Sequence, residues 1–136
     1  LQRLSLRHMA LDHTGSLWIG AQHEGPATDQ APLIAICAED RELGFAEINP
    51  QKLSALRNYV GGVAASGDGR RIGFTSPVGG ALLVLDVGNG SAALQSQPQV
   101  CGLAGRGSGF LTSTETGLLD NRMHSRFWDN HIAQMA

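Results

Sequence analysis

Histidine side chains and their polar neighbours are the groups in this sequence best suited to bind a ligand. The chain contains five histidines, and three of them, His8, His23 and His131, are candidate binding residues. Neutral imidazole is a good ligand for transition metals and titrates near neutral pH. The candidate binding residues are Arg7, His8, Gln22, His23, Trp128, Asp129, Asn130 and His131. Among them, His8 and His131 are the candidate metal ligands, with a transition metal as the candidate cofactor.

The segment from Trp128 to His131 admits two interpretations. On a strand, Asp129 and His131 are two residues apart and point to the same face. They could bind a metal together, or the carboxylate could orient the imidazole. Alternatively, Trp128 packs between sheets while Asp129 and Asn130 cap backbone amides, as expected where a ring of sheets is locked. We favour this second, structural interpretation.

His8 and His23 have structural alternatives as well. A lone histidine is more often structural than a ligand, so His8 could simply hold the backbone of a neighbouring sheet. His23 and Glu24 follow Gln22 at the start of a polar loop that runs to Ala31. Loops carry function more often than strands do, so this pair could chelate a metal. A solvated loop tip is the simpler expectation.

The sequence contains no recognisable catalytic motif. Ser108 lies between two glycines but lacks the spacing of a nucleophile elbow, and the segment is typical of a turn. The glycine-rich run at 102–107 precedes no helix that could present its amino terminus to a phosphate. No HExxH, CxxC or paired-carboxylate spacing appears. We therefore assign no catalytic residue.

The stretch from Tyr59 to Asp86 shows which elements must position these side chains. Three short apolar runs are separated by two turn signals, Gly67-Asp68-Gly69 and Pro77-Val78-Gly79-Gly80. Asp-Gly between apolar runs is a strong hairpin signal. The stretch therefore predicts an antiparallel meander, and weaker copies of it lie on both sides.

Hairpin glycines relate the three copies. Aligning Gly15, Gly69 and Gly109 divides the chain into units of about 40 residues or more with four short strands each, which is the spacing of propeller blades. We predict an all-β fold of about three four-stranded blades, forming one partial propeller domain. The expected blades are 4–58, 59–98 and 99–136. A self-contained β-sandwich is the alternative.

The first unit is longer than the others because it contains a predicted helix. Asn49 is the expected N-cap and Pro50 the first helical residue, so a short helix is predicted near 50–57. Leu53 and Leu56 would share one face of it.

Three blades cannot close a ring, so we expect a larger propeller with about half of it outside this sequence. One flank should then expose an apolar sheet face. The first strand of each blade lines the central channel, which places His8 near the channel mouth. The same count back from Gly69 and from Gly109 reaches Gly62 and Gly102, so only one blade offers an imidazole there.

Composition argues against several classes of protein. The net charge is −2 and the arginines are scattered, so there is no basic stripe for nucleic acid and no polybasic patch for a membrane surface. No apolar run approaches the roughly 20 residues that cross a bilayer. Cys37 and Cys101 lack a spacing signature, and a disulfide between them is open but not favoured.

Six short strings resemble, in the same order, a bacterial family of uncharacterised proteins, domain-of-unknown-function family 1513. They are Ser5-Leu6-Arg7-His8-Met9-Ala10, Gln22 with Gly25, Tyr59-Val60-Gly61-Gly62, Thr75-Ser76-Pro77 before Gly79-Gly80, Cys101-Gly102-Leu103-Ala104 and Trp128-Asp129-Asn130-His131. The resemblance covers nearly the whole chain and points to the C-terminal half of the family. It implies a quinoprotein-dehydrogenase-like propeller with WD40- or YVTN-like repeats and export to the periplasm. It also implies genetic linkage to imelysin-like iron-uptake proteins, and no established catalytic activity.

Three functions are compatible with these observations. The leading one is a non-catalytic binding or accessory protein of the periplasm, acting in iron acquisition with an imelysin-like partner. The second is an enzyme with a metal or redox site at the channel mouth. The third is a protein-interaction scaffold without a small ligand.

Overall fold

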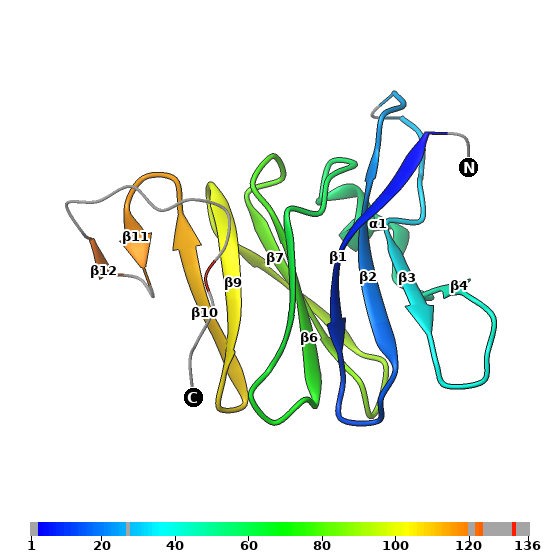
Figure 1. Cartoon of the computed structure of the whole chain (residues 1–136). Helices are drawn as coiled ribbons and strands as arrows, with labels where there is room; N and C mark the ends of the chain where they lie inside the picture. Colours follow the sequence, from blue (N-terminus) through cyan, green and yellow to red (C-terminus); the bar gives the residue numbers. More distant parts are fainter. Residues whose placement is uncertain (1–2, 27, 120–121, 124–131, 133–136) are drawn as a thin grey trace.

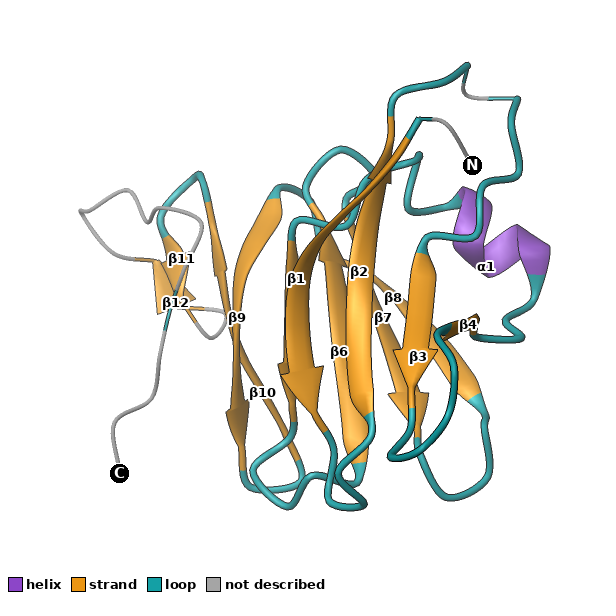
Figure 2. Ribbon diagram, turned by 45° about the vertical axis from the view of Figure 1, so that its right-hand side comes forward, coloured by secondary structure: helices purple, strands orange, loops and turns teal. Residues whose placement is uncertain are grey.

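The computed structural model consists of three four-stranded antiparallel sheets and one short helix (Figure 1, Figure 2). It describes residues 3–26, 28–119, 122–123 and 132. The all-β prediction with four-stranded units is confirmed, and the sheets do not close into a ring. No helix in the described part of the chain is long and apolar enough to span a membrane.

Each sheet is a meander whose strands follow one another along the chain. Sheet 1 contains β1 (Leu4–Leu11), β2 (Leu17–His23), β3 (Ile34–Cys37) and β4 (Gly44–Phe45). Sheet 2 contains β5 (Gly62–Ala65), β6 (Arg71–Ser76), β7 (Ala81–Asp86) and β8 (Ala92–Ser96). Sheet 3 contains β9 (Val100–Arg106), β10 (Gly109–Thr114), β11 (Leu118–Leu119) and β12 (Arg122–Met123).

The first strands of the sheets lie next to one another. β1 is beside β5, and β5 is beside β9, so the sheets are arranged around their first strands like successive propeller blades. The hairpins that follow these strands lie at one edge of the molecule, the lower edge in Figure 1. The β2–β3 loop lies at the opposite edge, and the helix lies below it, behind β2 and β3.

The three hairpin turns are linked by hydrogen bonds from each sheet to the next. The backbone N–H of His13 donates to the carbonyl of Gly69 (3.1 Å), and the N–H of Asp68 donates to the carbonyl of Gly107 (3.0 Å). Gly15 and Gly69 have positive φ, 83° and 68°, as their turn positions require. In the third hairpin Gly107 has the positive φ, 55°. Our alignment through Gly109 was wrong there, because the turn between β9 and β10 is shorter than the other two.

Asp12 organises the first turn. One carboxylate oxygen accepts hydrogen bonds from the N–H of Thr14 (2.7 Å) and of Ser16 (3.1 Å), and the other accepts from Nε1 of Trp18 (2.8 Å). Burial raises the pKa of Asp12, but the hydrogen bonds from Thr14, Trp18 and Ser16 together outweigh it, so the pKa lies below its ordinary value of 3.8. These contacts give Asp12 a structural role in the turn.

We expect Asp12→Asn to lower the free energy of unfolding by about 1–3 kcal/mol at neutral pH. The substitution replaces the carboxylate oxygen that accepts from the buried Trp18 N–H with part of a neutral amide. A carboxyl whose pKa is lowered by folding stabilises the native state above its ordinary value of 3.8, and that stabilisation is lost as the pH falls through the folded-state pKa. Urea unfolding of the unaltered protein and of Asp12→Asn, at neutral and at acidic pH, measures this difference in the free energy of unfolding. Glu47→Gln, at an exposed carboxylate, is the control. A difference that stays constant down to the lowest pH would contradict the assignment.

The predicted helix is present but shorter than expected. α1 spans Pro50–Ser54, and the side chain of its N-cap Asn49 accepts a hydrogen bond from the N–H of Gln51 (2.8 Å). The helix ends early because the chain reverses at Arg57 and Asn58, both with positive φ. Leu56, fully buried just after the helix, anchors this connection to the core.

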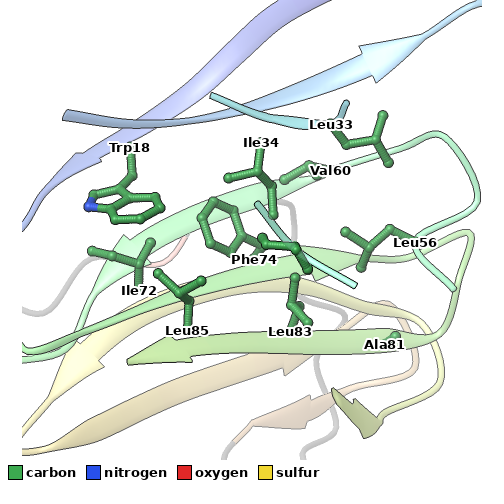
Figure 3. Packing of buried hydrophobic residues seen from close by; sticks show 11 residues of the cluster. Trp18, Leu33, Ile34, Leu56, Val60, Ile72, Phe74, Ala81, Leu83 and Leu85 are labelled. Atoms are coloured by element: carbon green, nitrogen blue, oxygen red, sulfur yellow. The ribbon is translucent and has the colours of Figure 1, made fainter. Parts of the chain in front are cut away.

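The core lies between sheet 1 and sheet 2 (Figure 3). Trp18 from β2 and Phe74 from β6 meet edge to face, with ring centroids 6.5 Å apart and planes at 65°. Gly20 keeps the sheets close, because a Cβ there would overlap Val60 and Val63. The buried cluster consists of Trp18, Leu33, Ile34, Ile48, Leu56, Val60, Ile72, Phe74, Ala81, Leu83 and Leu85.

Sheet 3 packs on sheet 2 through contacts that involve the backbone of both sheets. The Oγ1 of Thr75 donates to the carbonyl of Cys101 (2.9 Å). A Cβ at Gly105 would overlap the carbonyl oxygen of Ala65 and lie 3.0 Å from the amide nitrogen of Gly67. Cys101 is buried and Cys37 half-buried, and both are free thiols.

The fourth strand of sheet 3 in the described part of the chain is β12, and the segment 126–131 lies outside the described residues. The run Thr114 to Gly117 forms the turn between β10 and β11, and Gly117 has φ 91°.

Candidate functional site

The loop between β2 and β3 carries the most developed polar arrangement in the described part of the chain. Its first residues are held by neighbouring backbone: Gln22 forms an isolated bridge with Tyr59, and the N–H of His23 donates to the carbonyl of Asn58 (2.9 Å). The side-chain amide of Asn58 donates to the carbonyl of Pro26 (3.0 Å). The loop is therefore fixed at its base.

His23 and Asp29 pair within this loop. The Nε2 of His23 lies 2.8 Å from Oδ2 of Asp29, and only 12% of the His23 side chain is exposed against 46% for Asp29. A carboxylate only accepts hydrogen bonds, so Nε2 donates and Nδ1 of the neutral ring keeps its lone pair. That Nδ1 is buried and has no hydrogen-bond partner among the described residues. The expectation of a solvated loop tip is therefore wrong for His23.

Gly25 makes the pair possible. A Cβ at this position would overlap both Nε2 of His23 and Oδ2 of Asp29. The φ of Gly25 is not positive, so glycine is required here by the space between two side chains and not by its backbone conformation.

A cavity of about 460 Å³ opens beside the pair. It is lined by the exposed Arg3 and by His23 and Asp29. The remaining lining residues are Leu4, Gln30, Ala31 and Pro32. A second cavity of about 360 Å³ shares the segment 29–32 with the first and extends to Leu53 and Asn58.

This arrangement suits binding by hydrogen bonds. The imidazole is fixed in orientation by a carboxylate, and its second nitrogen offers a lone pair to a donor. No group of three histidine, cysteine, aspartate or glutamate side chains gathers within the described ranges.

The other candidates from β1 have separate environments. The register shifts between Leu6 and His8, so Arg7 is the extra residue of a bulge, and its side chain is exposed. His8 is half-buried and pairs with Gly20, on the face of sheet 1 that packs against sheet 2. By the same register His8 corresponds to Gly62 of sheet 2, which pairs with Thr75.

The remaining candidates, Trp128, Asp129, Asn130 and His131, lie outside the described residues. The structure thus places the consecutive residues Gln22 and His23 at the start of the site, and it pairs the side chain of His23 with that of Asp29. It does not place the predicted metal ligand His131 relative to His8.

Sequence analysis missed three residues of this site. Asp29 is six positions beyond His23 in an irregular loop, a spacing with no periodic signal. Arg3 reaches the same cavity from the start of β1. Gly25 could have been noticed as a glycine between two polar side chains, but its steric role appears only once the loop is folded.

Comparison with known proteins supports the fold. A solved structure of a luciferin-regenerating enzyme, a β-propeller, matches with a TM-score of 0.54 and 15% sequence identity. The match covers 86% of this chain and 41% of the enzyme chain, so this chain spans about two fifths of the length of that propeller. At this identity the likeness shows the fold alone. A search of curated proteins gave no match.

A family model supplies the remaining evidence. It is described as a protein of unknown function, DUF1513, and it matches residues 1–135 of the 136. The order of short strings from Ser5 to His131 pointed to the same family. This chain therefore belongs to the DUF1513 family.

Proposed function

We propose that this chain belongs to a non-catalytic binding protein of the periplasm that assists iron acquisition, and that the cavity beside His23 and Asp29 holds its small polar ligand. The observation that carries the proposal is the His23–Asp29 pair, which lines that cavity. Nδ1 of His23 is buried and has no partner among the described residues, which costs about 1–3 kcal/mol; a ligand that displaces the atoms covering Nδ1 and donates to it recovers that cost.

The surrounding groups define the ligand class. Nδ1 of His23 accepts, while the guanidinium of Arg3 at the cavity wall favours a negatively charged or oxygen-rich group. A small molecule that carries both a hydroxyl or N–H donor and a carboxylate satisfies both. Binding, not catalysis, is favoured because no described hydroxyl or thiol is hydrogen-bonded to the imidazole that could serve as a nucleophile.

The periplasmic location, the role in iron acquisition and the imelysin-like partner rest on the family membership and on what the resemblance implies. Cell fractionation tests the location directly. Affinity purification from the periplasm, with and without a chelator, tests the partner. Recovery of the protein in the cytoplasmic fraction would contradict the location, and loss of the partner on chelation would show that a metal, not protein surface, mediates the contact.

Native mass spectrometry of the protein purified from its own compartment tests the binding site. We expect a small-molecule adduct on the unaltered protein, and its loss in His23→Ala and in Gly25→Ala, which forces the His23–Asp29 pair apart without removing either side chain. His13→Ala is the matched control, because His13 is an exposed histidine in a hairpin turn.

Metal analysis of the same samples separates the alternatives. Metal content should not depend on His23 or on His8. A metal that is lost in His8→Ala and retained in His13→Ala would support a metal site at the channel mouth instead. An adduct that persists in both His23→Ala and Gly25→Ala would remove this cavity from the proposal.

A further inference from the structure

We propose that a groove between sheet 2 and sheet 3 is a second ligand site, separate from the His23 cavity, and that it binds an acidic sugar with a single carboxylate. The groove consists of two cavities of about 200 and 260 Å³. Arg71, Val84 and Gln95 line both of them, so the cavities are parts of one groove. Arg71 follows a hairpin at the lower edge of the molecule, whereas His23 starts the loop at the opposite edge (Figure 1).

Arg71 supplies the positive charge of this groove. Its Nη1 donates a hydrogen bond to the carbonyl of Ser108, in the hairpin of sheet 3 (3.1 Å). This bond holds the guanidinium across the two sheets. A guanidinium carries further N–H donors, so it can bind a carboxylate without giving up the bond to Ser108. No ion pair joins Arg71 to a carboxylate in the described part of the chain.

Asp86 is paired with Arg71 across the strands but is engaged elsewhere. Its Oδ1 accepts hydrogen bonds from the backbone N–H groups of Gly88 (3.0 Å) and Asn89 (3.2 Å), which hold the β7–β8 turn. Asp86 also lines the groove, and its second oxygen is an acceptor for a ligand hydroxyl. Its negative charge disfavours a ligand with several anionic groups. A ligand with one carboxylate and several hydroxyls therefore suits both Arg71 and Asp86.

The other polar groups of the groove are uncharged amides and hydroxyls. The Nε2 of Gln97 donates to Oγ1 of Thr112 (2.6 Å), which orients this amide and leaves its oxygen as an acceptor. Gln95 is exposed on β8, and Ser91 precedes that strand. An amide both donates and accepts, as a hydroxyl does, so amide side chains match the hydroxyls of a sugar. Polar groups thus line the groove along the whole of β8.

The remaining lining of the groove is apolar. Leu82 and Val84 from β7 and the half-buried Phe110 from β10 contribute to it. Phe110 lies close to sheet 2 because Gly73 has no side chain: a Cβ there would lie 3.1 Å from the ring of Phe110. Small-molecule sites combine apolar walls with a few polar groups that fix the orientation of the ligand. An acidic pyranose offers C–H faces to these walls, together with its carboxylate and hydroxyls.

Ligand-observed NMR titration, which detects weak binding, tests the site on the protein made from its complete coding sequence. The probe is D-glucuronate, and D-glucose, which lacks the carboxylate, is the control ligand. We expect glucuronate to bind about tenfold more tightly than glucose, and Arg71→Gln to weaken glucuronate binding about tenfold or more. Arg41→Gln is the matched control, because Arg41 is an exposed arginine in the β3–β4 loop; it should bind glucuronate like the unaltered protein.

A second variant separates binding from folding, because Arg71 also links sheet 2 to sheet 3. Ala93 is exposed on β8 and lines the groove. Ala93→Phe therefore fills part of the groove while Arg71 stays in place, and it should also weaken glucuronate binding about tenfold. Circular dichroism and urea unfolding check that each variant is folded. If Arg71→Gln unfolds, Ala93→Phe decides the outcome.

Three results would overturn the proposal. The first is the absence of glucuronate binding, or binding no tighter than that of glucose. The second is unchanged glucuronate binding in folded Ala93→Phe. The third is loss of glucuronate binding in His23→Ala with full retention in Arg71→Gln and Ala93→Phe, which would place the sugar in the His23 cavity. Because the adduct test of the His23 cavity uses other variants, failure of the groove leaves that proposal to its own test.

Discussion

Replacing Phe74 with alanine is expected to lower the free energy of unfolding by about 3–5 kcal/mol. Phe74 is fully buried between sheet 1 and sheet 2, where it meets the ring of Trp18. Its loss removes an aromatic pair and leaves a cavity that flanking β-strands cannot easily fill. Urea or thermal unfolding followed by tryptophan fluorescence measures the change.

Leu94→Ala is the matched control for this prediction. Leu94 lies in the same cross-strand row as Phe74 but at the outer strand β8, where it is 40% exposed. A change of about 1 kcal/mol or less is expected there. If the two variants lost similar stability, the seam between sheet 1 and sheet 2 would not be the main core.

Gly105→Ala is expected to cost about 3 kcal/mol, at the upper end for overpacking. The new Cβ would overlap the carbonyl oxygen of Ala65 and lie 2.9 Å from the carbonyl carbon of Ser66, so it meets backbone that cannot rotate away. Sheet 3 must then move off sheet 2. Unfolding experiments measure the loss, and hydrogen exchange should show faster exchange in β9 and β10 than in β2.

Gly109→Ala provides the comparison on the adjacent strand. A Cβ at Gly109 would have its nearest described neighbour 3.9 Å away, and its φ is not positive. This substitution should be nearly neutral. A large loss in Gly109→Ala with none in Gly105→Ala would show that the contact between Gly105 and Ala65 does not hold the two sheets together.

The sheets were predictable because their signals are local. Alternation of apolar residues and the Gly67-Asp68-Gly69 turn specify sheet 2 within a short window, and Asn49 and Pro50 specify the start of α1. The glycine that turns the third hairpin could not be predicted in the same way, because Gly107 and Gly109 both flank Ser108 and are equally good turn residues by sequence. The positive φ of Gly107 and the hydrogen bond that its carbonyl accepts from Asp68 distinguish them in the folded chain.

The candidate site was only partly predictable. His23 stood out by its chemistry. Its partner Asp29 could not be predicted, because the two residues meet only through the path of an irregular loop. That path depends on long-range contacts such as the hydrogen bond from Asn58 to Pro26. The sequence alone could not assign the apolar residues of β1 to a face of sheet 1, since the bulge at Arg7 decides on which side Leu6 lies.

The hydrogen bonds between hairpin turns have a direction, and this has a consequence for assembly. His13 donates forward to Gly69, and Asp68 donates forward to Gly107; each sheet thus uses one surface toward its successor and a different one toward its predecessor. Such heterologous contacts give a closed ring when the rotation returns to its start and an open filament when it does not. A chain in which no sheet precedes sheet 1 carries one unsatisfied half of such a contact, so shortened versions of this protein should be prone to head-to-tail polymerisation.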